Sequence, residues 1–399
     1  MSADPIFWMA AVALALPVWA TVRILRSDLQ KHRKVTCLIG AWIMPVIGPL
    51  AMLIEVPRRG SGVAGEASGV SLIDAPSPET LEVPGRKPFE IRAHLADGNG
   101  FPMLDWRALD SWAAPDAATQ DPRTARDAVG GGRRAWLSHM RDALAGSHLL
   151  ETHDAWVLSS YEPHLARSVG DYVSAARARI TRLLDGIAKF PAGERTIFIA
   201  FDSEQHYYHY VANYYPEDGE FAFSGGMYIN AGCPHFVTVK DELWRLEPVI
   251  AHELTHAALA HLKLPLWLDE GIAVTTEDHV ASKYTRPHGH HLELLEKHLN
   301  FWNPERLQEF WTGRSFHRPD EGQSLSYDLA RHMVGLLGRE WRSFTAFATQ
   351  ALRADGGAGA ARVALGIDLG ELAAAALRVT PQAGWSPDPS LWEKSPLER

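Results

Sequence analysis

Cysteine is nearly absent from this chain, since only Cys37 and Cys233 occur among its 399 residues. Two cysteines exclude a disulfide-rich scaffold and a zinc site built from cysteine thiolates. A basic surplus is missing too, because 39 Lys and Arg stand against 48 Asp and Glu, for a net charge of −9. No cationic excess is available to neutralise phosphates, so we expect no nucleic-acid partner.

The composition is otherwise that of a folded protein, with 46% hydrophobic and 22% charged residues. A chain of 399 residues is longer than one ordinary domain needs. Glycine, proline, alanine, serine and aspartate dominate residues 59–134, which predicts a linker. Residues 135–380 have the pattern of a globular domain, and residues 381–399 that of a loose, proline-rich tail.

Two long apolar runs precede the linker, at residues 6–25 and 35–56. Each is about long enough to cross the ~30 Å hydrocarbon core of a bilayer as a helix. Five basic residues lie at the connection between them, against two directly after the second run. By the positive-inside rule, this favours a cytoplasmic connection and an extracytoplasmic globular domain. Residues 1–58 are therefore predicted to form a two-helix transmembrane hairpin, with a two-span membrane localisation and bilayer contact through residues 6–56.

The same segment resembles a known membrane module. Its stretches "WATVRILRSD" and "WIMPVIGPLAMLI" are similar to the two-span segment at the N-terminus of cardiolipin synthases and related phospholipase-type proteins. The resemblance covers about residues 5–60. It implies membrane anchoring and nothing about catalysis.

The globular part begins with strands and then becomes helical. Strands are predicted near residues 155–160, at "RTIFIAF", within "EFAFSGGMYIN" and at "HFVTV". Between the first two strands, apolar residues recur every three or four positions, which predicts a helix. Ser203 is placed to cap a further helix. From about residue 240 to residue 380 the pattern is mostly helical, so we expect an α+β fold.

One segment of this helical part carries the pattern H-E-x-x-H, as His252, Glu253 and His256. Apolar neighbours and the absence of a breaker before Pro265 predict a helix, with Pro248 in its first turn. At 3.6 residues per turn, the two histidines share a face about 6 Å apart along the axis. Two imidazole nitrogens can then bind one Zn²⁺, and Glu253 can take a proton from an activated water.

A third ligand is expected from the helical stretch "LWLDEGIAVTTE" that follows. Thirteen residues separate Glu270 from the motif, and a short turn can bring it to face the histidines. Gly271 allows close backbone approach there. Asp269 is the competing carboxylate, but it points about 100° away on the same helix. The sequence thus predicts zinc as cofactor, bound by His252, His256 and Glu270.

Two alternatives to a catalytic zinc site remain open. The three groups could be buried side chains with ordinary hydrogen-bond partners, although burial of such groups without a metal or ion pair is costly. They could also hold zinc in a protein without activity.

The motif residues carry a family resemblance. "VIAHELTHA" and "PLWLDEGIA" resemble the gluzincin zinc metallopeptidases, whose third ligand is a glutamate in a "W-L-x-E-G-x-A" segment, and the thirteen-residue interval resembles the peptidase MA-like domains. The resemblance spans roughly residues 146–380 and implies a zincin-like fold. It implies that His252, His256 and Glu270 bind zinc and that Glu253 is the catalytic base and acid.

Two tyrosines are singled out by comparison with these enzymes. Aminopeptidase relatives carry G-x-M-E-N on an edge strand, where the glutamate holds the free amine of the substrate. Tyr228, in "GGMYI", stands at that glutamate's position, which favours an endopeptidase. An oxyanion also needs a donor besides the metal, and Tyr327 in "QSLSYDLARHM" is the candidate catalytic residue for that role.

The sequence therefore predicts a membrane-anchored zinc metallopeptidase with a peptide or protein substrate. The alternative is a membrane-tethered pseudoprotease that binds zinc and partners without turnover. The retention of Glu253 favours the enzyme, because a pure binder needs the metal ligands but not the base.

Overall fold

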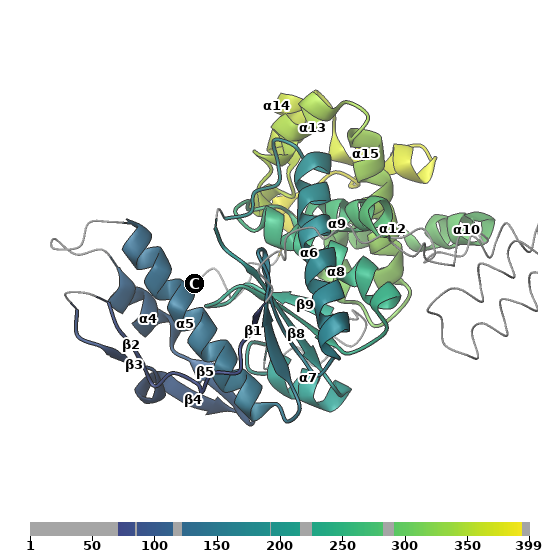
Figure 1. Cartoon of the computed structure of the whole chain (residues 1–399). Helices are drawn as coiled ribbons and strands as arrows, with labels where there is room; N and C mark the ends of the chain where they lie inside the picture. Colours follow the sequence, from purple (N-terminus) through teal and green to yellow (C-terminus); the bar gives the residue numbers. More distant parts are fainter. Residues whose placement is uncertain are drawn as a thin grey trace, which may run out of the picture. The chain divides into compact units, whose positions relative to one another are not determined.

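The computed structural model describes residues 71–83, 86–114, 122–191, 193–215, 226–281 and 291–392. All of them belong to the second of two compact units of the chain, Gly69–Arg399. This unit has an α+β architecture. Its described residues form a six-stranded mixed sheet, two two-stranded sheets and twelve α-helices (Figure 1).

The central sheet has the strand order β1-β6-β7-β8-β10-β9. Strands β7, β8 and β10 are parallel to one another, and the other neighbours pair antiparallel. Strand β9 forms one edge of this sheet and β1 the other. The strands are β1 (Ser71–Leu72), β6 (His148–Glu151), β7 (Ala155–Ser159), β8 (Thr196–Phe201), β9 (Gly226–Ile229) and β10 (His235–Val239).

Alternating side chains of the sheet enter two different cores. One row, which includes Phe198 and Phe236, packs with helices α6 (Pro163–Leu183) and α8 (Leu243–Leu259). The next row, which includes Ile199 and Val237, packs with helix α5 (Pro122–Ala143). Side chains alternate in this way because successive residues of a strand point to opposite faces. Figure 1 shows α5 on one side of the sheet and α6 with α8 on the other.

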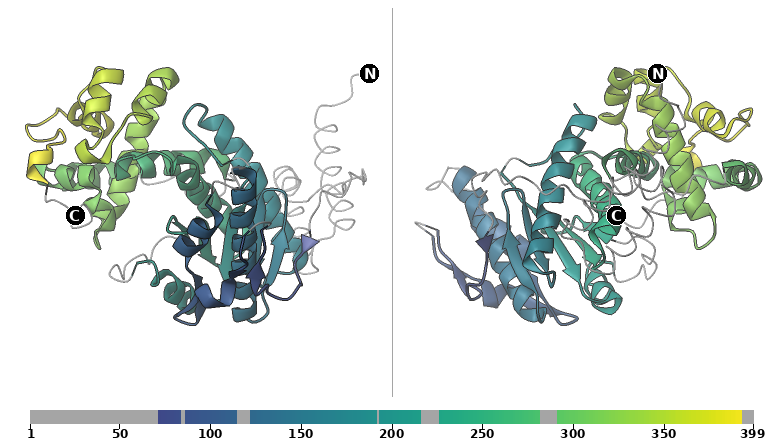
Figure 2. Two further views of the ribbon diagram at one scale, coloured as in Figure 1. Left: turned by 90° about the vertical axis from the view of Figure 1, so that its left-hand side faces the viewer. Right: turned by 45° about the vertical axis from the view of Figure 1, so that its right-hand side comes forward.

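Local signals in the sequence set several helix starts. Ser203 caps helix α7 (Glu204–Val211), as expected, since its hydroxyl accepts a hydrogen bond from the backbone N–H of His206 at 3.2 Å. Seven α-helices follow α8 among the described residues and form the helical half. Figure 2 shows the last of them gathered away from the sheet. These helices are α9 (Leu266–Val280), α10 (His291–Phe301), α11 (Pro304–Thr312), α12 (Gly322–Leu337), α13 (Trp341–Ala348), α14 (Ala358–Ala364) and α15 (Leu369–Leu377).

The structure differs from the prediction of a linker at residues 59–134. The described part of this segment contains a helix, residues 122–134 of α5 and several strands. Ile91, Leu104 and Leu109 from this segment are buried in the core that surrounds Trp136. The elements before α5 are β2 (Thr80–Leu81), β3 (Phe89–Glu90), β4 (Leu95–Gly98), β5 (Phe101–Leu104) and α4 (Trp106–Ala113).

The predicted loose tail at residues 381–399 also differs over its described part. Trp385 is only 3% exposed, and its carbonyl accepts a hydrogen bond from the indole N–H of Trp311 at 2.8 Å. The amide of Gln308 donates to the carbonyls of Gly384 and Ser386. The segment up to residue 392 is therefore docked on the helical half.

The prediction of a transmembrane hairpin needs correction. Within the part of the chain that the structure describes, no helix is both long enough and apolar enough to cross a membrane. The structure therefore does not support the two-helix transmembrane hairpin of residues 1–58 or the two-span membrane localisation. The runs at residues 6–25 and 35–56, on which both predictions rested, lie outside the described residues.

Candidate metal centre

Helix α8 presents both histidines of the motif on one face. His252 and His256 are one turn apart, while Ile250 and Leu254 lie on the opposite face of the helix and enter the core shared with α6. The helix begins at Leu243, so Pro248 lies inside it rather than in its first turn. The buried apolar face fixes the rotation of α8 about its axis. That rotation turns the two imidazoles toward α9.

Helix α9 brings the predicted third ligand to the same point. The Nε2 atoms of His252 and His256 are 3.1 Å apart. The Oε2 atom of Glu270 lies 3.2 Å from Nε2 of His252 and 3.5 Å from Nε2 of His256. Three ligands at 2.0–2.1 Å from a tetrahedral Zn²⁺ would be about 3.3 Å apart. The three atoms thus have the spacing of ligands around one ion, and the predicted set is brought together.

The hydrogen bonding of Glu270 gives a further test of whether these residues fit a metal. Its Oε2 atom is buried and has no hydrogen-bond partner, although two imidazole nitrogens lie within 3.5 Å. Neither imidazole therefore directs an N–H at this oxygen. A buried carboxylate oxygen without a partner is costly, and a cation between the three atoms would satisfy it. The donor set of two imidazoles and one carboxylate suits zinc.

Through its other ring nitrogen, each histidine contacts a second carboxylate. Nδ1 of His252 lies 3.3 Å from Oε2 of Glu277, and Nδ1 of His256 lies 3.2 Å from Oδ2 of Asp269. Such contacts hold the ring so that Nε2 faces the metal. Asp269 was expected to be a spectator and is instead a partner of His256. Glu277 was missed, although it lies seven residues after Glu270 and therefore on the same face of α9.

The carboxylates dominate the electrostatics of the site. Burial lowers the pKa of His252, but Glu270 and Glu277 outweigh it and raise that pKa to about 9. Burial likewise opposes protonation of His256, while Asp269 and Glu270 raise its pKa well above the usual value. The two histidines in turn lower the pKa of Glu270. The site thus attracts positive charge, which a divalent ion can supply in place of protons.

Glu253 lies beside the ligands and is held by the edge strand. Its Oε2 atom accepts a hydrogen bond from the backbone N–H of Tyr228 in β9 at 2.8 Å. The residue is 6% exposed, and burial raises its pKa, against the opposing effect of His252 and His256. A carboxylate with a raised pKa next to a metal site is suited to accept and return a proton.

Tyr327 faces the same cleft from helix α12. The cleft has a volume of about 440 Å³ and is lined by all three predicted ligands, Glu253 and Tyr327. The phenol ring packs edge-on against Phe316, with ring centroids 5.1 Å apart. Burial and the charges of Glu270 and Glu253 raise the pKa of Tyr327, so the hydroxyl stays protonated and can donate a hydrogen bond.

Helices α9 and α12 approach each other most closely beside the third ligand. A Cβ atom on Gly271 would lie 2.8 Å from the carbonyl oxygen of Ala330 and 2.8 Å from Cγ2 of Val334. Glycine is therefore required at this contact, as the sequence indicated. The contact places the helix that carries Tyr327 against the helix that carries Glu270.

Other histidines do not join the centre. His261 lies at the end of α8 on a different cavity from the ligands, as expected from its spacing. His288, in the histidine-rich "RPHGHH", lies outside the described residues. Among the residues that the structure describes, His252, His256 and Glu270 form the one group that could share a metal ion.

No family model, curated protein or solved structure matches this chain.

Proposed function

We propose that this chain is a zinc metallopeptidase, a hydrolase that cuts peptide bonds and most simply acts as an endopeptidase. The observation that carries the proposal is the triangle of Nε2, Nε2 and Oε2 atoms, with sides of 3.1, 3.2 and 3.5 Å, next to Glu253. A base is not needed to hold a metal. The position of Glu253 beside the three ligands favours hydrolysis over storage or structural use of the ion.

The residues of the chain have distinct tasks in this proposal. Bound at His252, His256 and Glu270, zinc would supply a Lewis acid that polarises a carbonyl group and acidifies water. Glu253 accepts a proton from the attacking water and returns it to the leaving amine. The backbone N–H of Tyr228 holds Oε2 of Glu253 in place for this transfer. Tyr327 donates a hydrogen bond to the oxygen on which negative charge develops.

The resemblance to gluzincins supports the same assignment, since it implies these roles for the same four motif residues. The endopeptidase proposal rests on Tyr228, which stands where aminopeptidases of this kind carry an amine-binding glutamate. Tyr228 lies on the edge strand β9, to which an extended peptide can add through main-chain hydrogen bonds.

The substitution Glu253→Gln tests the proposal. We expect this variant to bind one zinc per chain, as the wild type does, because none of the three ligands changes. We expect peptide cleavage to fall by about 10²- to 10⁴-fold, the usual contribution of a general base. Metal analysis and digestion of a proteome-derived peptide library, read by mass spectrometry, measure both quantities. Equal behaviour of wild type and variant on every peptide would favour a zinc-binding protein without turnover.

A further inference from the structure

A second cavity shares part of its lining with the cleft that contains the metal ligands. We call the first cavity, with the ligands, the metal lobe, and the second, of about 480 Å³, the cationic lobe. Both cavities are lined by Tyr228, Asn230, Glu253 and Ala260. The two lobes therefore meet at the proposed base and at the edge strand that holds it.

The lining of the cationic lobe has an excess of positive charge. Four cationic residues line it, against the two acids Glu194 and Glu253. The cations are Arg133, Arg177, Lys189 and Arg195. Three acidic residues and one arginine, Arg353, line the metal lobe in addition to its histidines, and a bound Zn²⁺ would offset those acids. A group with negative charge is therefore attracted to the cationic lobe.

The arginines of the cationic lobe are already engaged. Arg133 pairs with Glu194 at 2.8 Å, and Arg195 pairs with Glu151 at 3.1 Å. Arg177 donates hydrogen bonds to the backbone carbonyls of Asp154 and Glu194, 3.1 and 3.0 Å away. These contacts keep the guanidinium groups in the wall of the lobe.

Lys189 and His261 differ from the arginines. Both are exposed, and neither side chain has a hydrogen-bond or ion-pair partner among the described residues. They border a wall that also contains Phe190 and Leu254. An ammonium group and an imidazole at the rim of a partly apolar cavity can bind a carboxylate without first giving up another partner.

We propose that the cationic lobe is a substrate subsite that binds a carboxylate, with Lys189 and His261 as its specificity-determining residues. This inference rests on the proposed peptidase function. A peptide that reacts beside Glu253 lies next to the cationic lobe, because Glu253 lines both lobes. The carboxylate belongs either to an acidic side chain near the scissile bond or to the C-terminus of the substrate.

Matched peptides test this subsite. From one sequence that the wild type cleaves, we would make variants with glutamate or glutamine at each of three positions on either side of the bond. Each is prepared with a free or an amidated C-terminus, which separates the two sources of carboxylate. We expect kcat/KM to favour the carboxylate by about threefold or more at one position, on one side only, and less so at high salt.

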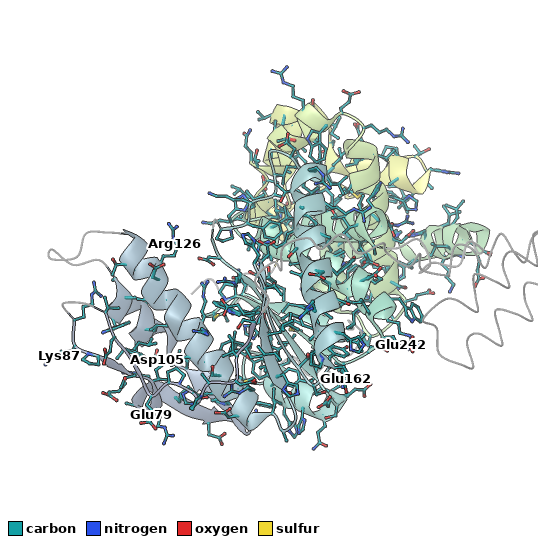
Figure 3. The ribbon with its side chains drawn as sticks, in the orientation of Figure 1. Glu79, Lys87, Asp105, Arg126, Glu162 and Glu242 are labelled. Atoms are coloured by element: carbon teal, nitrogen blue, oxygen red, sulfur yellow. The ribbon has the colours of Figure 1, made fainter. Side chains whose placement is uncertain are left out.

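The substitution Lys189→Glu should remove or reverse that preference. The matched control is Lys87→Glu, which makes the same change beside β3, where Figure 3 shows Lys87 at the periphery of the molecule. Lys87→Glu should leave the preference as in the wild type. Equal preferences in the wild type and Lys189→Glu, or no preference at all, would overturn the subsite while leaving the peptidase in place.

A binding measurement keeps the subsite testable if no peptide is cleaved. The probes are two fluorescein-labelled decapeptides of alanine and leucine, with one central glutamate or glutamine, and the readout is anisotropy with the zinc-loaded full chain. We expect the glutamate peptide to bind about threefold more tightly or better, and Lys189→Glu to abolish the difference. Absence of cleavage refutes the proposed function, whereas equal binding of the two peptides refutes the subsite.

Discussion

At the scale of single residues, the outer carboxylates are as much a part of the centre as the ligands. Asp269 and Glu277 contact the Nδ1 atoms of His256 and His252. Both acids are partly buried, with side chains 25% and 20% exposed, so their contacts are shielded from solvent more than surface pairs are. They orient the rings and increase the basicity of the Nε2 atoms.

We predict that Asp269→Asn and Glu277→Gln each weaken zinc binding by about 10- to 100-fold, because each removes the charge that orients one ligand. Competition with a chelating dye measures this affinity. Glu371→Gln, on the exposed face of α15, is the matched control and should bind zinc like the wild type. Affinities within about twofold of the wild type for both site variants would show that these contacts are incidental.

The spacing of residues was sufficient to predict which three side chains converge, but not the carboxylates that contact them. Two histidines four residues apart on an apolar helix point to one place, and Glu270 has the spacing of a third ligand. Asp269 was dismissed on helix geometry, because about 100° separates it from Glu270. That reasoning considered only whether Asp269 could contact the metal. The imidazole of His256 has two nitrogens, and the second lies where Asp269 points.

At the scale of elements, α12 is joined to α10 through a buried hydrogen bond to a charged carboxylate. Asp328 of α12 lies 2.9 Å from Nε2 of His298 in α10, 2.6 Å from Arg331 and 3.3 Å from His332. The indole N–H of Trp302 donates to Nδ1 of His298 at 2.8 Å. Nδ1 is therefore an acceptor, and the proton of His298 is on Nε2, directed at Asp328.

We predict that Asp328→Asn destabilises the fold by about 1.5–3 kcal/mol at pH 7, the cost of weakening charged hydrogen bonds. Burial raises the pKa of Asp328, but His298, His332 and Arg331 outweigh it, so the folded pKa lies below the unfolded one. The stabilisation is then present above the unfolded pKa of about 3.9 and is lost as pH falls below it.

Urea unfolding of wild type and Asp328→Asn at several pH values measures this difference. We expect a gap that narrows as pH falls below about 4. Arg331 keeps its charge throughout, and its distant contact with Asp278, at 4.0 Å, does not replace Asp328. A gap that stays unchanged between about pH 5 and pH 2 would contradict the assignment of Asp328 as the stabilising charge.

Elements defined by local signals were predictable, and those that depend on distant packing were not. The strand "TIFIAF" and the cap at Ser203 are readable from neighbours in the chain. The strands of residues 71–104 are short, and their sparse apolar residues gain their burial from Trp136, far along the sequence. A composition rich in glycine and proline therefore predicted a linker where the structure has a folded segment.

At the scale of the whole molecule, the candidate metal centre connects α8, which packs on the sheet, to α9 in the helical half. Zinc would bind the folded chain and not the unfolded one, so it adds to stability in proportion to the logarithm of its concentration over Kd. At a free concentration of 100 Kd the gain is about 2.7 kcal/mol. Chelation removes it.

We predict that removal of zinc with a chelator lowers Tm by a few degrees, about 1–2 °C for each kcal/mol in a unit of this size. Differential scanning calorimetry of the full chain, with zinc restored afterwards, measures the shift. Glu270→Ala is the control and should show little response to chelator, because one ligand is gone. Identical Tm values of the wild type with and without zinc would contradict a resident metal at this site.

Features that depend on the whole molecule were the least predictable. The cationic lobe combines Arg133, Lys189 and His261, which are far apart in sequence and have no shared motif. Only the net charge and the order of strands and helices could be read in advance. The net charge of the whole chain is negative and gave no indication of this local cluster of cations.

The contact at Gly271 has a consequence for how this sequence can vary. Position 271 has room for a hydrogen atom and no more, since any β-carbon there would meet the backbone of Ala330. The neighbouring residue is the third ligand, and one turn before Ala330 lies Tyr327. A single added carbon would therefore change the spacing between two helices and, with it, the distance from ligand to hydroxyl. Among descendants of this sequence, position 271 should be as invariant as the histidines, although its side chain has no chemistry of its own.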